Sequence, residues 1–144
     1  METTSFSEIF DRAIFHFREL DFSKLNSEDR AYILMIYMLS ALADFCAVCN
    51  LSLPYDKDAQ KFNVQLTEEQ IEILTLGTSF YWLDYQAKHA NTLHNRMYTK
   101  DAGFFSPANL RREINSSWKI LHDQWRKRIV EYSYMHSDLG NLKV

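Results

Sequence analysis

The scarcity of glycine and proline is the sequence feature that most constrains this fold. The chain of 144 residues contains only three glycines and two prolines. Since most tight turns need one of these residues, long helices are favoured over a sandwich of many short strands. A hydrophobic share of 47% is enough for one core in a chain of this length. The sequence therefore predicts a single all-α domain over residues 1–144, with about four helices in a bundle.

The first two predicted helices have polar residues at their starts. Ser5 is followed by Glu8 in a capping-box pattern, and apolar residues then recur at helical spacing as far as Leu20. Asn26 or Ser27 can cap the second helix.

The third predicted helix starts with another capping box, formed by Thr67 and Gln70. We expect this helix to continue to about residue 97. Gly77 falls inside it, where glycine costs about 1 kcal/mol relative to alanine. A glycine at such a position indicates close approach to another helix.

The most apolar segment runs from Ala31 to Cys49 and contains Asp44 as its only charge. Its length is close to the roughly 20 residues that span a membrane, but an aspartate inside a span costs about 2.5 to 3.5 kcal/mol. Neither flank carries a cationic cluster. Because helices that are hydrophobic all round also occur at the centre of bundles, we expect a buried helix of a soluble protein, without membrane contact. Asp44 then needs a partner or an outward orientation.

Cys46 and Cys49 form a CxxC pattern at the end of this segment. A redox pair lies at the start of a helix, and a structural zinc site needs four ligands, so neither interpretation fits. We expect two core cysteines one turn apart. The N-terminus has no signal-peptide pattern, which favours a reducing cytoplasm.

Residues 50–66 have little apolar periodicity, although Phe62, Val64 and Leu66 alternate briefly. The segment is long for a plain linker, which indicates a projecting arm, with an extended piece or a hairpin, that contacts neighbours. After Tyr134 the periodicity ends, and we expect a flexible C-terminal tail or one that a partner orders.

The fourth predicted helix begins at Pro107, where a missing backbone amide does no harm. Its apolar stripe consists of Leu110, Ile114, Trp118, Leu121, Trp125, Ile129 and Tyr132. Beside this stripe lie five potential cations, Arg111, Arg112, Lys119, His122 and Arg126. Two interpretations of this basic edge stay open. It is either a solvated rim that covers the core, or a contact surface for an acidic partner, namely a neighbouring subunit or nucleic-acid phosphates.

A rigid turn is predicted just before this helix. Gly103 permits a chain reversal, and Ser106 can cap the helix that follows. Phe104 and Phe105 can anchor the turn on the core. We include both phenylalanines with the basic edge in a predicted interface.

The charges are unevenly distributed along the chain. Residues 1–72 carry 13 acids and 6 bases, whereas residues 73–144 carry 6 acids and 10 bases. If the two halves stay apart in space, copies of the chain can dock head to tail.

Catalytic, cofactor-binding and metal-binding patterns such as GxxxxGK[ST], HExxH and GxSxG are absent from the sequence. His122 and Asp123 are consecutive on a helix, so we expect their side chains to point apart. Tyr98, Lys100 and Asp101 cluster in the predicted turn, and we interpret them as structural. The sequence therefore predicts no catalytic residue, no cofactor, no metal and no small-molecule substrate.

Three stretches between about Thr67 and Tyr134 carry a resemblance to a class of proteins: "LTEEQIEILTLGTSFYWL", "MYTKDAGFFSPANLRREI" and "WRKRIVEYSY". They resemble small helical proteins of tailed bacteriophages, among the head-to-tail connector, or neck, components. The resemblance implies a non-enzymatic virion protein, present in the host cytoplasm during assembly. It also implies a homo-oligomeric ring around the DNA channel between the portal and tail proteins, with the fourth helix, its basic edge and the tail contacting adjacent subunits.

A nucleic-acid-binding regulator that uses the basic edge is the main alternative. It predicts salt-dependent DNA binding that weakens when Arg111, Arg112 and Lys119 are neutralised. The net charge of −3 and the lack of a short helix-turn-helix signal count against it. A small helical enzyme is a third alternative, without any sequence signature.

Overall fold

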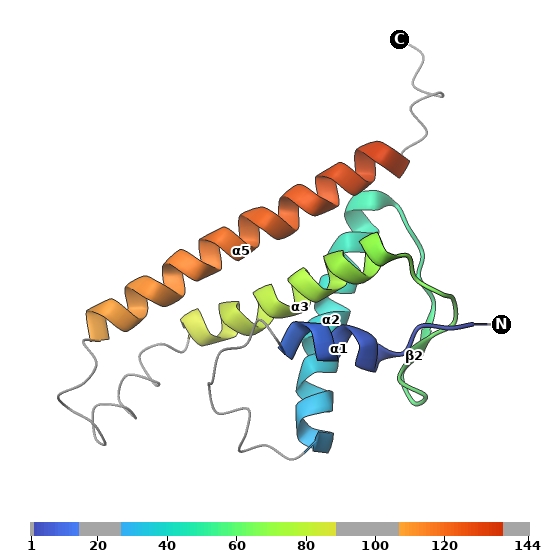
Figure 1. Cartoon of the computed structure of the whole chain (residues 1–144), viewed down its shortest axis with the longest axis horizontal. Coiled ribbons are helices and arrows are strands. Elements are labelled where there is room, and N and C mark those ends of the chain that lie inside the picture. The colour runs from blue at the N-terminus through green and yellow to red at the C-terminus, as the bar shows by residue number, and fades with distance from the viewer. Residues whose placement is uncertain (1, 15–26, 89–106, 137–144) are drawn as a thin grey trace, which may run out of the picture.

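The computed structural model of the chain describes residues 2–14, 27–88 and 107–136. In these ranges it has four helices, namely α1 (Phe6–Ile14), α2 (Ser27–Cys49), α3 (Glu68–Lys88) and α5 (Pro107–His136). Two short strands, β1 (Tyr55–Asp56) and β2 (Lys61–Phe62), pair antiparallel. Figure 1 shows α5 along one edge of the molecule, with the other described elements on its inner side. The predicted all-α fold with about four helices is confirmed.

Helix α3 is the centre of the bundle, because every residue from 73 to 80 is buried. Its polar members are Thr75, Thr78 and Ser79, whose hydroxyls donate to backbone carbonyls one turn back at 2.7 to 2.9 Å. Since these hydroxyls are satisfied within the helix, α3 can be buried on all sides despite its mixed composition. The expectation that the most apolar segment lies at the centre is therefore wrong.

At Gly77 both α2 and α5 approach α3 closely. A Cβ atom added at Gly77 would lie 2.5 Å from the Cβ of Ala41 and 2.8 Å from Nε1 of Trp125. Ala41 belongs to α2 and Trp125 to α5, so any side chain here would collide with both helices. The close approach predicted from this glycine is confirmed.

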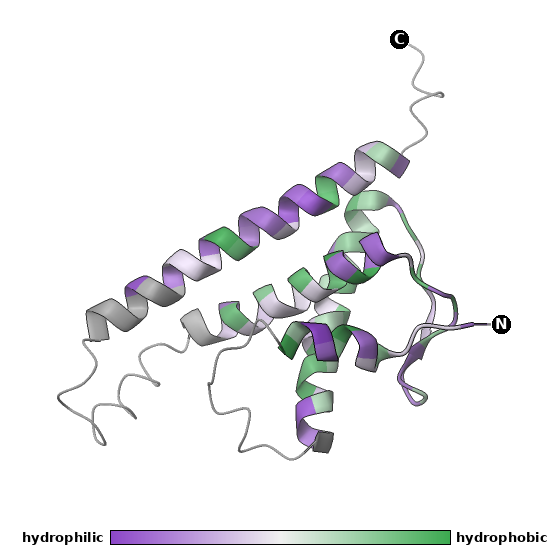
Figure 2. Cartoon of the chain, viewed as in Figure 1, coloured by the Kyte–Doolittle hydropathy of each residue, from purple (hydrophilic) through white to green (hydrophobic). Residues whose placement is uncertain are grey.

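Helix α2 lies at the side of the bundle and is buried on one face only. Figure 2 shows hydrophobic residues along most of its length. Leu34, Met38 and Phe45 are buried in the core, whereas Tyr32 is 60% exposed and Ile36 is also exposed. The prediction of a buried helix holds for one face only, because α2 has apolar residues on all sides and the other described elements cover only that face.

Of the described helices, α2 is the one long and apolar enough to cross a membrane, judged by length and composition alone. About a third of its most apolar window, 33%, is buried inside the protein. Asp44 accepts a hydrogen bond from the hydroxyl of Tyr81 on α3, so the partner predicted for this aspartate is present.

The segment between α2 and α3 folds back onto α1 and does not project. Phe62 is fully buried with its ring centroid 5.1 Å from that of Phe6, and Leu66 is buried too. The backbone carbonyl of Thr4 accepts the amide of Phe62 at 2.8 Å, and its side-chain oxygen accepts the amide of Leu66 at 2.8 Å. The predicted hairpin is confirmed, but a projecting arm is not, because its apolar residues are buried against the N-terminal segment.

The starts of α1 and α3 are capped by side chains. Ser5 Oγ accepts the amide of Ser7 at 3.3 Å. Thr67 and Gln70 form the predicted capping box, with the amide of Thr67 on Gln70 Oε1 at 2.9 Å and the amide of Gln70 on Thr67 Oγ1 at 3.2 Å.

Helix α5 continues two residues past Tyr134, which corrects the predicted start of the tail. His136 stacks on Tyr132 at a centroid distance of 4.1 Å, and its Nε2 lies 3.1 Å from a carboxylate oxygen of Glu69. These contacts hold the last turn of α5 against the start of α3. The rest of the tail and residues 15–20 and 89–97, expected to extend two of the helices, lie outside the described residues.

Candidate functional site

The basic edge predicted on the fourth helix is partly present on α5. Arg112, Lys119 and Arg126 recur every seven residues and are exposed, so they form one row along the helix. We call these three residues the basic row. The side chain of Arg111, together with Phe104 and Phe105, lies outside the described part of the chain, as do Tyr98, Lys100, Asp101 and the turn at Gly103.

His122 does not belong to the basic row. Its ring stacks on Trp118 with a centroid distance of 5.4 Å and an interplanar angle of 9°, and it lies 5.1 Å from Phe80. Its Nδ1 is 3.5 Å from a carboxylate oxygen of Asp123, so these neighbours meet even though helical geometry alone predicts divergence. His122 therefore packs on Trp118 and Phe80 while it stays partly exposed, and its place in the interface stays a prediction.

An aromatic cluster with two aspartates joins α2, α3 and α5. The indole of Trp118 on α5 donates to Asp84 on α3 at 3.0 Å, and Tyr81 on α3 donates to Asp44 on α2. Burial, followed by the hydrogen bond and charge of Asp44, raises the pKa of Tyr81 to about 12. Asp44 was visible in the sequence as an isolated charge, but nothing there identified Tyr81 as its partner.

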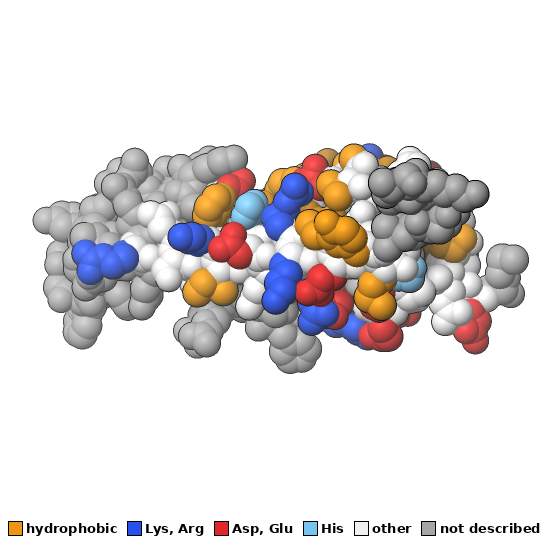
Figure 3. Space-filling view, turned by 90° about the horizontal axis from the view of Figure 1, so that it is seen from above, with side chains coloured by type: hydrophobic (Ala, Val, Ile, Leu, Met, Phe, Trp, Pro, Cys, Tyr) orange, Lys and Arg blue, Asp and Glu red, His pale blue; other side chains and the backbone are white. Residues whose placement is uncertain are grey.

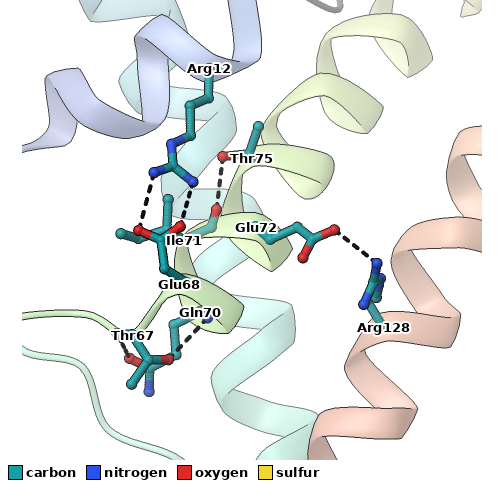
Figure 4. Close-up of polar contacts among 8 residues, drawn as sticks. All are labelled: Arg12, Thr67, Glu68, Gln70, Ile71, Glu72, Thr75 and Arg128. Carbon is teal, nitrogen blue, oxygen red and sulfur yellow. Dashed lines mark hydrogen bonds and ion pairs between the residues drawn. The ribbon is translucent and has the colours of Figure 1, made fainter.

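The first turn of α3 is acidic, and cations from two other helices meet it. Arg12 on α1 makes two hydrogen bonds to Glu68 at 2.9 and 3.2 Å, and Arg128 on α5 lies 3.0 Å from Glu72 (Figure 4). Hydrogen bonding from Arg12 lowers the pKa of Glu68. Arg128 belongs to the basic half of the sequence and Glu72 to the acidic half, so the two halves are in contact here. Head-to-tail docking was predicted on the condition that the halves stay apart in space, and this condition is met only in part.

An open depression of about 350 Å³ flanks these ion pairs. Its lining residues are Arg12, Glu68, Glu69, Glu72, Thr75 and Leu76. Arg12 pairs with Glu68, while Glu69 and Glu72 contact His136 and Arg128 of α5. Because these charged groups already have partners and are exposed to water, the depression is better described as a solvated junction than as a ligand pocket.

Several exposed acids lie on elements other than α5. Glu8 and Asp11 on α1 and Asp56 and Asp58 in the hairpin are exposed. In Figure 1 the hairpin lies at the opposite end of the molecule from the start of α5. The basic row therefore begins at the end remote from the exposed hairpin acids.

The outer face of α5 does not present a continuous basic stripe. Figure 3 shows Lys and Arg side chains on this face interleaved with acidic and hydrophobic ones. Such a mixed face is less suited to a polyanion than an unbroken row of cations would be.

The two thiols of the CxxC pattern lie at the edge of the core. Cys46 and Cys49 are free and pack, partly buried, against the core, as predicted. Burial raises the pKa of both thiols, which opposes formation of the reactive thiolate. Within the described ranges, no group of three or more His, Cys, Asp or Glu side chains could hold a metal ion.

Comparisons of the chain with protein-family models, curated proteins and solved structures give no significant match. The geometry of the described residues leaves two candidate surfaces. One is the exposed face of α5, and the other, the acidic surface, consists of Glu8 and Asp11 on α1 and Asp56 and Asp58 in the hairpin.

Proposed function

We propose that the protein is a non-enzymatic component of a phage neck that assembles as a homo-oligomeric ring between portal and tail. The phage assignment rests on the sequence resemblance. The observation that carries the ring is that the exposed basic row of α5 begins at the end of the molecule remote from the exposed hairpin acids (Figure 1).

A head-to-tail contact uses two different surfaces of each subunit, so that every copy keeps one surface free for the next until the ring closes. In the proposed ring, Arg112, Lys119 and Arg126 of one subunit face Glu8, Asp11 and the hairpin acids of the next. Complementary charges of this kind mainly fix register and speed association. Apolar contacts have to supply most of the affinity.

The assignment to virions is tested by purifying phage particles from a host that expresses a tagged copy of this chain. The proposal expects the chain to co-purify with particles in a fixed ratio to the portal protein. A chain that is absent from particles contradicts the proposed function.

The ring contact is tested by reversing the basic row with Arg112→Glu, Lys119→Glu and Arg126→Glu together. We expect this variant to fold but to be lost from particles. A matched control reverses Lys57 and Lys61 in the hairpin, which lie on the acidic surface and not on the basic row. Equal incorporation of both variants contradicts the proposed contact.

The exposed basic row also supports a second candidate, a DNA-binding regulator. Three bases can neutralise only a few phosphates, so such binding would be weak and strongly salt-dependent. Fluorescence anisotropy with duplex DNA at low salt tests it, since each lost phosphate contact should reduce the salt slope by about 1. Lack of binding at low salt removes this candidate.

A further inference from the structure

The outer face of α5 carries a second stripe, opposite the stripe that enters the core. Its six members alternate at steps of four and three residues: Ser116, Ile120, Asp123, Lys127, Val130 and Tyr134. This alternation is the spacing of a coiled-coil seam, in which successive members face one partner helix. We call these six residues the outer seam.

All members of the outer seam are exposed, including its large hydrophobic residues. Ile120 is 57%, Val130 46% and Tyr134 66% exposed. Figure 1 shows that the described elements lie on the inner side of α5, and Figure 3 shows hydrophobic side chains exposed on the outer side. A second helix can therefore lie along this face without meeting α1, α2 or α3.

The outer seam is complementary to itself when a second copy lies antiparallel. With a two-fold axis near Trp125, Ile120 of one copy faces Val130 of the other, and Asp123 faces Lys127. Ser116 then faces Tyr134. Each of these three layers occurs twice, once on either side of the axis, as an isologous contact requires.

A parallel arrangement would give a different result. It would place Asp123 against Asp123 and Lys127 against Lys127, and like charges in facing positions are destabilising. The charge pattern thus selects the antiparallel orientation and one register.

We propose that two copies of the free chain pair through the outer seam of α5 as an antiparallel, two-fold symmetric coiled coil. The seam spans 19 residues, which is about 28 Å of helix. The Ile120–Val130 layers supply the apolar contact, and the Asp123–Lys127 layers set orientation and register at some cost in affinity.

Arg126 opposes this dimer. It flanks the outer seam next to the axis, so the Arg126 side chains of the two copies approach each other. Removing this charge should therefore strengthen the dimer while it weakens a ring contact through the basic row. The dimer does not rest on the proposed function, because an isologous contact closes at two copies and cannot build a ring.

Sedimentation equilibrium of the full chain, combined with a charge swap, tests the inference. Wild type should associate to about 34 kDa, twice the 17.1 kDa of one chain. Asp123→Lys and Lys127→Asp should each weaken the dimer at least about tenfold, because each places like charges together twice. The double variant should restore it, and an equimolar mixture of the two single variants should form heterodimers.

Two controls separate this effect from others. Glu2→Lys makes the same charge change near the N-terminus, outside both the seam and the proposed ring contact, and should leave the dimer unchanged. Arg126→Gln should tighten it. Circular dichroism checks that each variant folds, which is expected because every substituted side chain is exposed.

Three outcomes overturn the inference: a wild-type chain that stays a monomer at every concentration, a dimer that the single reversals do not weaken, or a double variant that does not recover. A monomeric wild type would leave the seam to a different protein. A chain that dimerises as described but is absent from phage particles keeps this inference and removes the proposed function. A chain that is found in phage particles but fails the charge-swap test keeps the proposed function and removes the inferred dimer.

Discussion

Gly77 shows how a single missing side chain sets the distance between three helices. Replacing it with alanine gains about 1 kcal/mol in helix propensity. The added Cβ would, however, lie 2.5 Å from the Cβ of Ala41 and 2.8 Å from the indole of Trp125. Neither atom is at the end of a flexible chain, and overpacking of this kind costs about 1 to 3 kcal/mol.

We therefore expect Gly77→Ala to lower the free energy of unfolding in urea despite the better propensity. The control is Ser117→Ala on the exposed part of α5, which should be neutral or slightly stabilising. A Gly77→Ala variant as stable as that control would show that the helices can move apart at little cost.

A second prediction at the residue scale concerns the hydroxyl of Tyr81. Tyr81→Phe keeps the ring contacts with Phe80 and Trp125 but removes the donor to Asp44, so we expect a loss of about 1 kcal/mol at neutral pH. The unfolded chain releases the tyrosine proton near its ordinary pKa of 10, whereas the folded chain releases it near 12.

This difference in pKa has a definite sign. The contribution of Tyr81 is complete below pH 10 and is lost as pH rises through about 12. The wild type should therefore lose its advantage over Tyr81→Phe in that range, as measured by urea unfolding at stepped pH. A stability difference that stays constant up to pH 12 would contradict the assignment.

At the scale of elements, the start of α3 is held both by its own cap and by α5. Gln70 accepts the amide of Thr67 and donates its side-chain amide to the hydroxyl of Tyr132 at 2.9 Å. One buried side chain thus caps α3 and ties it to α5.

Thr67→Ala removes only a cap and should cost about 1 kcal/mol. Gln70→Ala removes a cap and also the buried hydrogen-bond partner of Tyr132. Its loss of folding free energy should therefore exceed that of Thr67→Ala by about 1 to 3 kcal/mol. Thermal unfolding of both variants tests this order. If the two losses are equal, the link to α5 contributes nothing.

At the scale of the whole molecule, α1, α2, α3, α5 and the hairpin contribute to one buried cluster. The three tryptophans, Trp82, Trp118 and Trp125, lie on α3 and α5, whereas circular dichroism reports on all helices. If the cluster unfolds as one unit, fluorescence and circular dichroism should give coincident urea transitions. A circular-dichroism transition at lower urea would mean that α1 or α2 separates from the core first.

The sequence by itself determined the helices and several of their ends. The spacing of apolar residues, the Thr67–Gln70 box and Pro107 act over one or two turns, so they are readable without knowledge of the fold. Gly77 indicated a close contact for the same local reason, although its partners were not identifiable.

Only the tertiary structure decided which helix lies at the centre and which faces remain outside. Composition alone placed α2 at the centre of the bundle, because α2 is the most apolar segment. Composition does not show that the hydroxyls of Thr75, Thr78 and Ser79 donate to carbonyls within α3, which lets that helix be buried instead. Helical spacing placed His122 on a basic edge but could not show that its ring also packs on Trp118 and Phe80. A side chain's role depends on what lies opposite it, and that neighbour comes from a distant part of the chain.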